Sequence, residues 1–341
     1  MTYIELFKNI FRAQLAKPLI KKNSNIGQLI LKKNIFKKKK FYIIKRIFAA
    51  SGIFSNLTFV IDQIIFAKKK KLIPIIDMEN FPTVYNENKK INNSKNSWDY
   101  FFKPLNNYKL NNIYKNSQFI FSPNEKNILK EIDENKKAQS IFFKTIKFRK
   151  IITNSYFKKK KIFFKNNKKI LGVHIRGTLQ RIVAAHSYPP KPIDILNEAM
   201  IIFKKYNCDK VFLVTEDEIY FNIFKKNFKK KLITNNTPRS KVNFLGSHNS
   251  HFENYNRRNH RFNLGKETII DTFLLSDSHI FLYTNSNVSR YAKVLSKKKQ
   301  IRFEFKTKLN SKNKFLARWK WYLKNYIPFI FGSIKYKIIK H

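Results

Sequence analysis

Two kinds of hydrophobic pattern alternate along the second half of the chain. Short runs of consecutive apolar and β-branched residues occur at 170–175, 210–214 and 279–284, which is typical of strands that are buried on both faces. Between them, apolar residues recur at three- and four-residue intervals, as in 192–203, which indicates amphipathic helices. Strands that alternate with helices predict an α/β fold with a parallel, doubly wound sheet.

A shorter alternation of the same kind occupies the first half. A turn of small residues at 49–56 precedes apolar positions with helical spacing at 57–65. Ser55 and Asn56 are candidate caps for this helix. An apolar run at 72–77 then predicts a strand. This turn–helix–strand unit predicts a second α/β domain.

Breaks in the pattern divide the chain into four parts. The lysine- and asparagine-rich run at 158–169 interrupts the apolar periodicity and sets a boundary near residue 165. The aromatic block at 98–104 is either core or a surface on which a sugar could stack. We expect a basic N-terminal segment over 1–45, an N-terminal α/β domain over 46–165, a C-terminal Rossmann-like domain over 166–305, and a basic, aromatic C-terminal segment over 306–341.

The net charge of the 341 residues is +50, with 71 lysines and arginines against 21 acidic residues. Such a charge points to nucleic acid or to an anionic membrane. Lysine, asparagine, isoleucine and phenylalanine, however, share AT-rich codons, and glycine is scarce at 7 residues, so genomic bias explains the same composition. Because no nucleic-acid-binding motif is recognised, we expect no specific nucleic-acid partner.

The sequence also indicates in which cellular compartment the protein is expected. Cys208 is the one cysteine, so no internal disulfide forms. No apolar run reaches the length of about 18 residues typical of a membrane-spanning helix, and the N-terminus lacks the apolar core of a secretory signal. The aromatic and basic residues of 306–341 suit either a membrane interface or a helix that wraps the domain. We therefore expect a cytoplasmic protein, peripheral at the inner membrane face.

Polar residues follow three of the predicted strands. Arg176 follows the first, 215–218 follow the second, and 284–289 follow the third. Ligands of parallel α/β sheets bind beyond the carboxyl ends of the strands, and an arginine beside a helix N-terminus suits a phosphate. Alternatively, Arg176 is simply solvated and the last segment only caps a helix. The candidate diphosphate-binding residues are Arg176, Asn285, Ser286, Asn287 and Ser289.

Several carboxylates could take part in chemistry. Asp271 could accept hydrogen bonds from a guanine edge. The acidic residues at 216–218 resemble a metal-binding pattern, but we expect them to line the strand end or cap the next helix, with no metal. Asp77 and Glu79 follow a predicted strand, where they serve either a site or a polar turn.

Three segments together resemble a known family. Residues 174–178, 211–217 and 270–290 look like the three motifs of the GDP-fucose-dependent fucosyltransferases, in the same order. The nearest branch is the α-1,6 group, which includes the N-glycan core and nodulation-factor enzymes. A weaker likeness covers 52–67 and 98–104.

The resemblance implies a GT-B-like fold, with two Rossmann-like domains and a cleft between them, and an inverting, metal-independent glycosyltransferase without a cofactor. GDP-fucose or a related GDP-sugar would be the donor, and a glycan the acceptor. By position in the motifs, Arg176 would hold the β-phosphate and stabilise departing GDP, His174 would lie beside the donor, Asp271 would read guanine, and Ser286 and Asn287 would bind phosphate.

The chain also departs from that branch. Gly177 replaces a second arginine, residues 179–180 replace an Asp-Lys pair, and Ala184 occupies the position of the proposed base. The alternatives are therefore another GDP- or UDP-sugar transferase, an inactive member, or a basic nucleic-acid- or membrane-binding protein without catalysis. The candidates for the base or for acceptor contacts are Asp77, Glu79 and His186.

Overall fold

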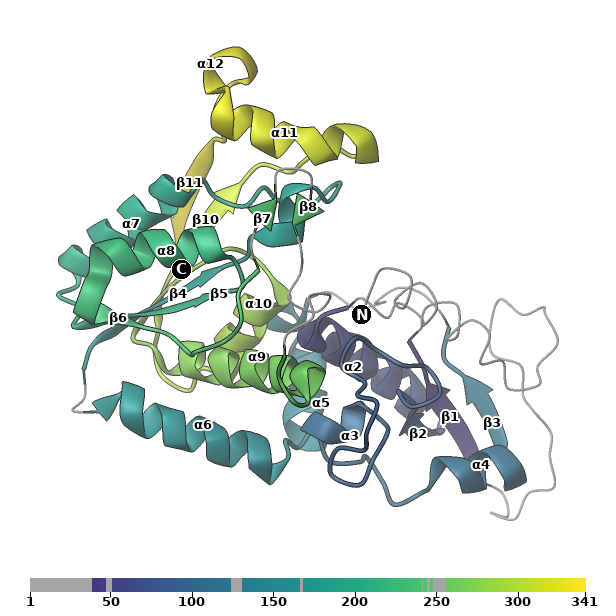
Figure 1. Ribbon diagram of the computed structural model, residues 1–341. Coiled ribbons are helices and arrows are strands. Elements are labelled where there is room, and N and C mark those ends of the chain that lie inside the picture. Colours follow the sequence, from purple (N-terminus) through teal and green to yellow (C-terminus); the bar gives the residue numbers. More distant parts are fainter. Residues whose placement is uncertain are drawn as a thin grey trace. The chain divides into compact units, whose positions relative to one another are not determined.

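The structure is a computed structural model (Figure 1). It describes residues 39–46, 51–123, 131–165, 168–240, 242–243, 246–247 and 256–341. Most of the expected basic N-terminal segment, residues 1–38, and part of the small-residue turn, residues 47–50, therefore lie outside the described residues. The described residues form two compact units: unit 1 comprises those within 1–154 and 256–269, and unit 2 comprises those within 155–255 and 270–341.

Unit 1 is built on a parallel sheet with the order β2-β1-β3. The strands are β1 (Lys40–Ile44), β2 (Ile73–Ile76) and β3 (Gln118–Phe121). Helix α2 (Ile53–Lys69) connects β1 to β2. Its N-cap is Gly52, so the expectation that Ser55 or Asn56 caps the helix is wrong. The helix starts earlier because Ile53 already belongs to the buried face.

The remaining elements of unit 1 are short. They are α3 (Trp98–Phe101), α4 (Leu110–Asn116), a 3-10 turn η1 (Ile132–Glu134) and α5 (Lys136–Thr145). The aromatic block that includes α3 is buried: Trp98 is 2% exposed and stacks on Phe102 at 4.3 Å between ring centroids. The block is thus core rather than a sugar-stacking surface.

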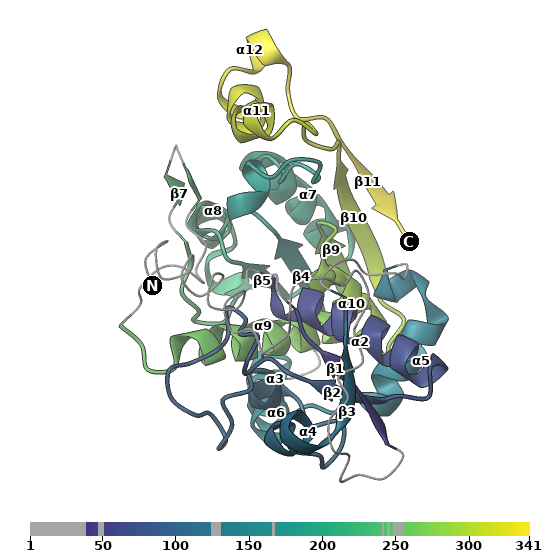
Figure 2. The ribbon, with the colours of Figure 1, turned by 90° about the vertical axis from the view of Figure 1, so that its right-hand side faces the viewer.

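Unit 2 contains the larger sheet, which Figure 2 shows with β10 and β11 side by side. The strand order is β11-β10-β9-β4-β5-β6, and every pair is parallel except β10 with β11. The strands are β4 (Ile170–Ile175), β5 (Lys210–Thr215), β6 (Leu232–Ile233), β9 (Ile280–Tyr283), β10 (Ile301–Thr307) and β11 (Tyr336–Lys340).

Helices cover both faces of this sheet, as expected for a doubly wound fold. Leu171 and Val173 of β4 belong to one hydrophobic core, together with the inner faces of α7 (Pro192–Lys205) and α8 (Glu218–Phe228). Ile170 belongs to the core on the other face, with α9 (His260–Asp277) and α10 (Asn287–Leu295). Alternate residues of one strand therefore serve two cores. Smaller elements of unit 2 are η3 (Thr178–Arg181), η4 (Lys229–Lys231) and the hairpin of β7 (Val242–Asn243) and β8 (Gly246–Ser247).

The boundary between the units differs from the expected one near residue 165. Most of α6 (Lys150–Phe163) folds with unit 2, because Tyr156 and Lys160 both bond to Asp277, at 2.6 and 2.7 Å. Of the lysines that suggested a break, Lys158 and Lys161 are exposed, whereas Lys159 and Lys160 bond to residues of unit 2. Residues 256–269, expected in the C-terminal domain, fold with unit 1, where Arg261 Nη1 donates to the carbonyl of Asn86 at 2.9 Å.

The C-terminal residues, expected as a separate segment over 306–341, are integrated into unit 2. They form α11 (Lys314–Tyr326), α12 (Pro328–Phe331) and β11. Trp321 of α11 is buried and donates from Nε1 to the carbonyl of Pro189 at 3.0 Å. Across the described part of the chain, no helix has both the length and the apolar character required to span a bilayer.

Candidate active site

The direction of winding in the unit 2 sheet reverses between β4 and β9. From β4 the chain proceeds to β5 and β6 on one side, whereas β9 and β10 lie on the other. Such a switch point is where open α/β sheets bind ligands, beyond the carboxyl ends of the strands. The register pairs Ile175 with Thr215 and His174 with Tyr283, so the three strand ends singled out in the sequence are neighbours.

Thr284 holds the two strand ends at the switch point together. Its N–H donates to the His174 carbonyl at 3.0 Å, and its Oγ1 accepts from the N–H of Arg176 at 3.1 Å. The backbone of Arg176 is thereby fixed, while its side chain is exposed. A guanidinium in this place is accessible to a dissolved anion.

A helix N-terminus lies at the end of the neighbouring strand. Ser286 caps α10, and Ser286 and Ser289 form a reciprocal capping box, with N-to-Oγ distances of 3.2 and 2.9 Å. The two hydroxyls therefore fix the helix start. The N–H groups of Asn287 and Val288 lie in the first turn, which has no intrahelical acceptors, and the helix dipole adds positive potential there. This geometry suits an anion bound by backbone groups.

His174 lies on β4 just before Arg176, and its side chain is 5% exposed. Burial, with a smaller contribution from the Arg176 charge, lowers the pKa of His174 to about 3. The ring is therefore neutral near neutral pH. Its Nδ1 has no hydrogen-bond partner among the described residues. His174 can offer a hydrogen bond, but it cannot supply positive charge to a phosphate.

Two carboxylates organise the loop that follows Arg176. Thr178 donates from its N–H to Asp217 Oδ2 at 3.1 Å and from Oγ1 to Glu216 Oε1 at 2.5 Å. Asp217 also caps α8 through the N–H of Ile219 at 3.0 Å. In the part of the chain that the structure describes, no group of three or more His, Cys, Asp or Glu side chains is arranged to hold a metal ion.

Sequence reasoning missed Arg181 and the contact that Glu216 makes in this region. Arg181 is fully buried and forms an ion pair with Asp217. Glu216 is largely buried, which raises its pKa, while the nearby Arg176 charge opposes that shift. Arg181 follows the strand in a stretch without periodicity, so nothing in the sequence marked it as buried. The acidic run at 216–218 was noticed, but its contact with Thr178 depends on loop geometry.

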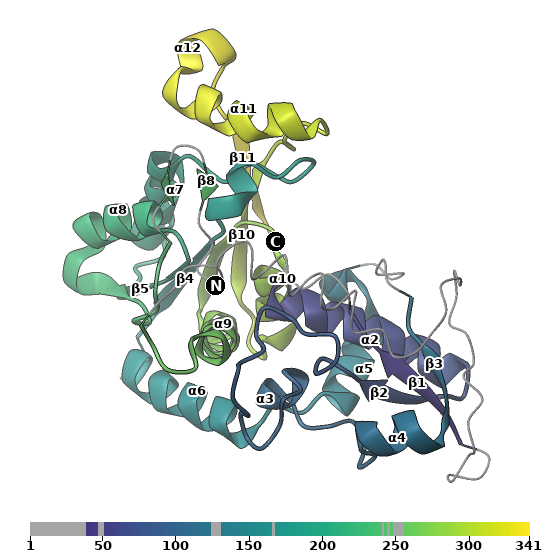
Figure 3. The same ribbon diagram turned by 45° about the vertical axis from the view of Figure 1, so that its right-hand side comes forward.

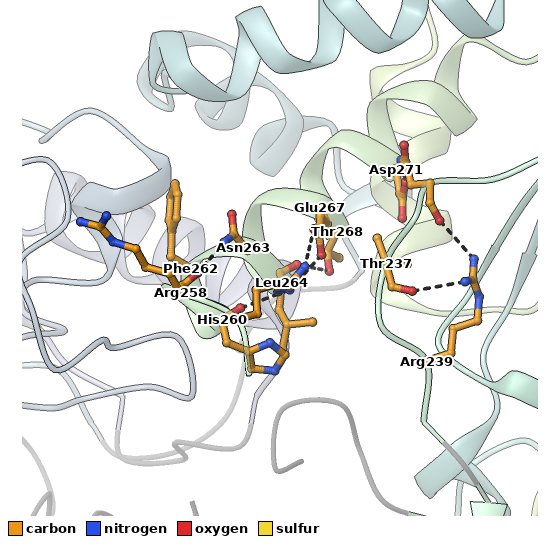
Figure 4. Close-up of polar contacts among 12 residues, drawn as sticks. Thr237, Arg239, Arg258, His260, Phe262, Asn263, Leu264, Glu267, Thr268 and Asp271 are labelled. Atoms are coloured by element: carbon orange, nitrogen blue, oxygen red, sulfur yellow. Dashed lines mark hydrogen bonds and ion pairs between the residues drawn. The ribbon is translucent and has the colours of Figure 1, made fainter. Parts of the chain in front are cut away.

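Asp271 lies on α9 beyond the end of β6. Asn235 Nδ2 donates to Asp271 Oδ1. Burial lowers the pKa of Arg239, and the charge of Asp271 partly opposes that shift. Figure 4 shows the Arg239 side chain pointing toward Asp271 from the loop after β6. Asp271 is 9% exposed. A guanine edge would therefore have to share this carboxylate with an amide and a guanidinium of the same unit.

The three candidate acceptor or base residues lie in different surroundings. Asp77, in unit 1, is fully buried and accepts from the Asn80 N–H at 2.9 Å and from the Tyr114 hydroxyl at 2.5 Å. It stabilises its own turn. Glu79 is exposed in the same turn. His186, in unit 2, is exposed, and burial of part of the ring together with the Arg176 charge lowers its pKa. The structure thus brings His186 into the electrostatic range of Arg176.

Solved structures provide the comparison for this architecture. NodZ α-1,6-fucosyltransferase soaked with GDP-fucose superposes with a TM-score of 0.50 and 15% identity, over 79% of this chain and 95% of that one. NodZ co-crystallised with GDP gives 0.51 and 14%, over 80% and 96%. NodZ from Bradyrhizobium gives 0.51 and 14%, over 79% and 96%. The chain has the GT-B fucosyltransferase fold.

The sequence resemblance to this fold is thereby confirmed at the level of architecture. At this identity the likeness establishes the fold and leaves substrate and reaction to the site itself. No family model matches the sequence, and no curated protein matches it either.

Proposed function

We propose that the protein is an inverting glycosyltransferase that transfers fucose from GDP-fucose to a glycan acceptor. The observation that carries the proposal is the pair of anion-binding groups at the switch point of unit 2. Exposed Arg176 and the N-terminus of α10 follow adjacent strands, and Thr284 links their backbones. NodZ binds GDP and GDP-fucose on the same fold, which supports a nucleoside diphosphate as the ligand.

The chemistry explains why positive charge is needed at this point. The acceptor hydroxyl attacks C1 of the sugar, the bond from C1 to the β-phosphate oxygen breaks, and the electron pair leaves with GDP. Negative charge therefore grows on the β-phosphate, where a preorganised guanidinium and backbone N–H groups stabilise the transition state. Arg176 and the first turn of α10 would provide these groups.

A general base must accept the proton of the acceptor hydroxyl. Of the three sequence candidates, His186 fits best, because it is exposed and its lowered pKa keeps the ring neutral and able to accept a proton near pH 7. Asp77 does not fit, since its oxygens are occupied within a buried turn. We assign no role to Glu79.

A binding panel followed by turnover tests the proposal. Thermal unfolding is measured with GDP, GDP-fucose, GDP-mannose, UDP and UDP-sugars, and release of GDP is then followed with a mixture of glycan acceptors. We expect a selective shift with GDP compounds and GDP release from GDP-fucose. Stronger stabilisation by UDP than by GDP would contradict the proposed donor class, and no shift with any nucleotide would contradict the site itself.

A further inference from the structure

The segment between β10 and β11 is anchored to unit 2 on one side only. In α11, Ala317 and Trp321 are buried, and the Ala317 carbonyl accepts from Asn310 Nδ2 at 2.9 Å. Trp321 packs in a small hydrophobic cluster with Tyr188 and Ile334. These contacts fix which side of α11 faces the protein.

The opposite side of α11 carries exposed aromatic residues. Phe315 is 70% exposed, Trp319 36% and Tyr326 60%. Their spacing of 4 and 7 residues places them along one stripe of the helix, away from Ala317 and Trp321. Most aromatic side chains of such size are buried when a protein is alone in water.

The next helix, α12, also carries exposed apolar residues. In α12, Phe329 is 84% exposed, Ile330 64% and Phe331 44%. Figures 1 and 3 show α12 at the outer end of unit 2, beyond α11. Large apolar side chains exposed on two consecutive helices indicate an interaction surface.

The charge of the segment that contains α11 and α12 indicates the kind of partner. Residues 306–341 contain ten lysines and arginines and no aspartate or glutamate. Cations beside aromatic and aliphatic side chains complement an anionic lipid surface, where headgroups meet the charges and the acyl boundary takes the apolar groups. A nucleic acid offers no apolar phase for Ile330, and a second copy of the chain carries the same +50 charge, which opposes self-association.

We propose that α11 and α12 form a lipid-docking surface that binds anionic bilayers. Phe329 and Ile330 enter the boundary between headgroups and acyl chains, Phe315 and Trp319 lie along it, and the surrounding lysines contact the headgroups. The proposal is independent of the donor, because binding to a bilayer requires no nucleotide.

Vesicle co-sedimentation of the full chain tests the proposal. The vesicles contain phosphatidylcholine alone or phosphatidylcholine mixed with phosphatidylglycerol. We expect binding to the mixed vesicles only, and a loss of about tenfold or more in the partition coefficient for the double variant Phe329→Ser/Ile330→Ser, which removes two large apolar groups from the contact. Both side chains are exposed, so the thermal unfolding of the variant should match that of the wild type.

Helix α6 offers a matched control. Phe157 and Ile162 are each 61% exposed and are adjacent to lysines 158–161. Phe157→Ser/Ile162→Ser should bind the mixed vesicles as the wild type does. Equal losses in the two double variants, or equal binding to neutral vesicles, would overturn the proposal. It would also be overturned by a dimer, formed without vesicles, that Phe329→Ser/Ile330→Ser dissociates.

Discussion

Arg181 and Asp217 form an ion pair in which both side chains are completely buried. The pair lies behind the loop that carries Arg176, and the Asp217 carboxylate also accepts the N–H of Thr178. The rings of Tyr220 and Trp321 cover the guanidinium, with centroids 5.8 and 4.7 Å from its central carbon. The pair thus holds the loop after Arg176 to the start of α8.

Removing one member of this pair should destabilise unit 2 strongly. Arg181→Ala leaves the Asp217 carboxylate buried without its cation, and such losses cost about 3 to 5 kcal/mol. The measurement is the free energy of unfolding from urea denaturation.

The double variant Arg181→Met/Asp217→Asn serves as the control, because it removes both charges while keeping most of the buried volume. It should recover a large part of the stability. If Arg181→Ala and the double variant were equally unstable, lost packing rather than an uncompensated charge would be the cause.

Gly177 should not tolerate even a methyl group. A Cβ there would overlap Asp217 Oδ2 and lie 2.8 Å from Tyr220 Cε2. Because these neighbours are buried and paired, Gly177→Ala should cost about 1 to 3 kcal/mol of unfolding free energy, as overpacking does.

Gly52 provides the comparison for that variant. A Cβ at Gly52 would meet nothing nearer than Tyr85 Oη, at 4.0 Å. Gly52→Ala exchanges one N-cap residue for another and should cost less than about 1 kcal/mol. Equal effects of the two substitutions would contradict the steric argument.

Arg176→Ala tests the proposed role of the guanidinium in the reaction. Loss of one preorganised charge donor should lower kcat for GDP-fucose by about 100- to 1000-fold, or about 3 kcal/mol of transition-state stabilisation. Since the side chain is exposed, the thermal unfolding temperature should change little. Arg176→Lys should retain part of the activity, because a lysine keeps the charge but loses the fork of donors.

The exposed arginine at position 258 allows a matched control. Arg258→Ala removes the same number of atoms and the same charge from unit 1, which does not contain the sheet that carries Arg176. Its turnover should equal that of the wild type. Unchanged turnover in Arg176→Ala would remove Arg176 from the mechanism.

The buried His174 should make stability depend on pH. Its folded-state pKa of about 3 lies below the value near 6.5 in the unfolded chain. Between these values the unfolded state binds the extra proton, so stability falls as the pH is lowered through that window, by up to about 1.4 kcal/mol per pH unit. From about pH 7 to about pH 5, the wild type should lose about 2 kcal/mol more than His174→Asn. Urea denaturation at the two pH values measures this difference, and parallel losses would contradict it.

The sequence was informative wherever apolar periodicity was undisturbed. Strands β4, β5 and β9 were predicted because their apolar runs are buried on both faces. In contrast, β1 and β11 were missed, since lysines surround their short apolar runs and conceal them. Because β1 is the central strand of its sheet and β11 is an edge strand, the lysines conceal strands irrespective of their place in the sheet.

Candidate site residues could be predicted where they follow a predicted strand. Arg176 and Ser286 could be singled out because each comes directly after a predicted strand. The ion pair of Arg181 and the hydrogen bonds of Thr284 could not be predicted, because they depend on how a loop turns back toward a neighbouring strand. Assignment of residues 256–269 to unit 1 was equally out of reach, since it depends on contacts such as that of Arg261 with Asn86.

The pairing of Thr307 with Tyr336 has a mechanical consequence. The pairing connects both ends of the segment that contains α11 and α12 to adjacent strands. The segment is therefore anchored to the sheet at both of its ends. The first end of this segment follows β10, which is parallel to β9, and β9 is parallel to β4. The segment therefore begins at the same edge of the sheet as Arg176. In the proposed lipid contact, a bilayer bound by Phe329 and Ile330 would fix the orientation of that edge of the sheet relative to the lipid plane.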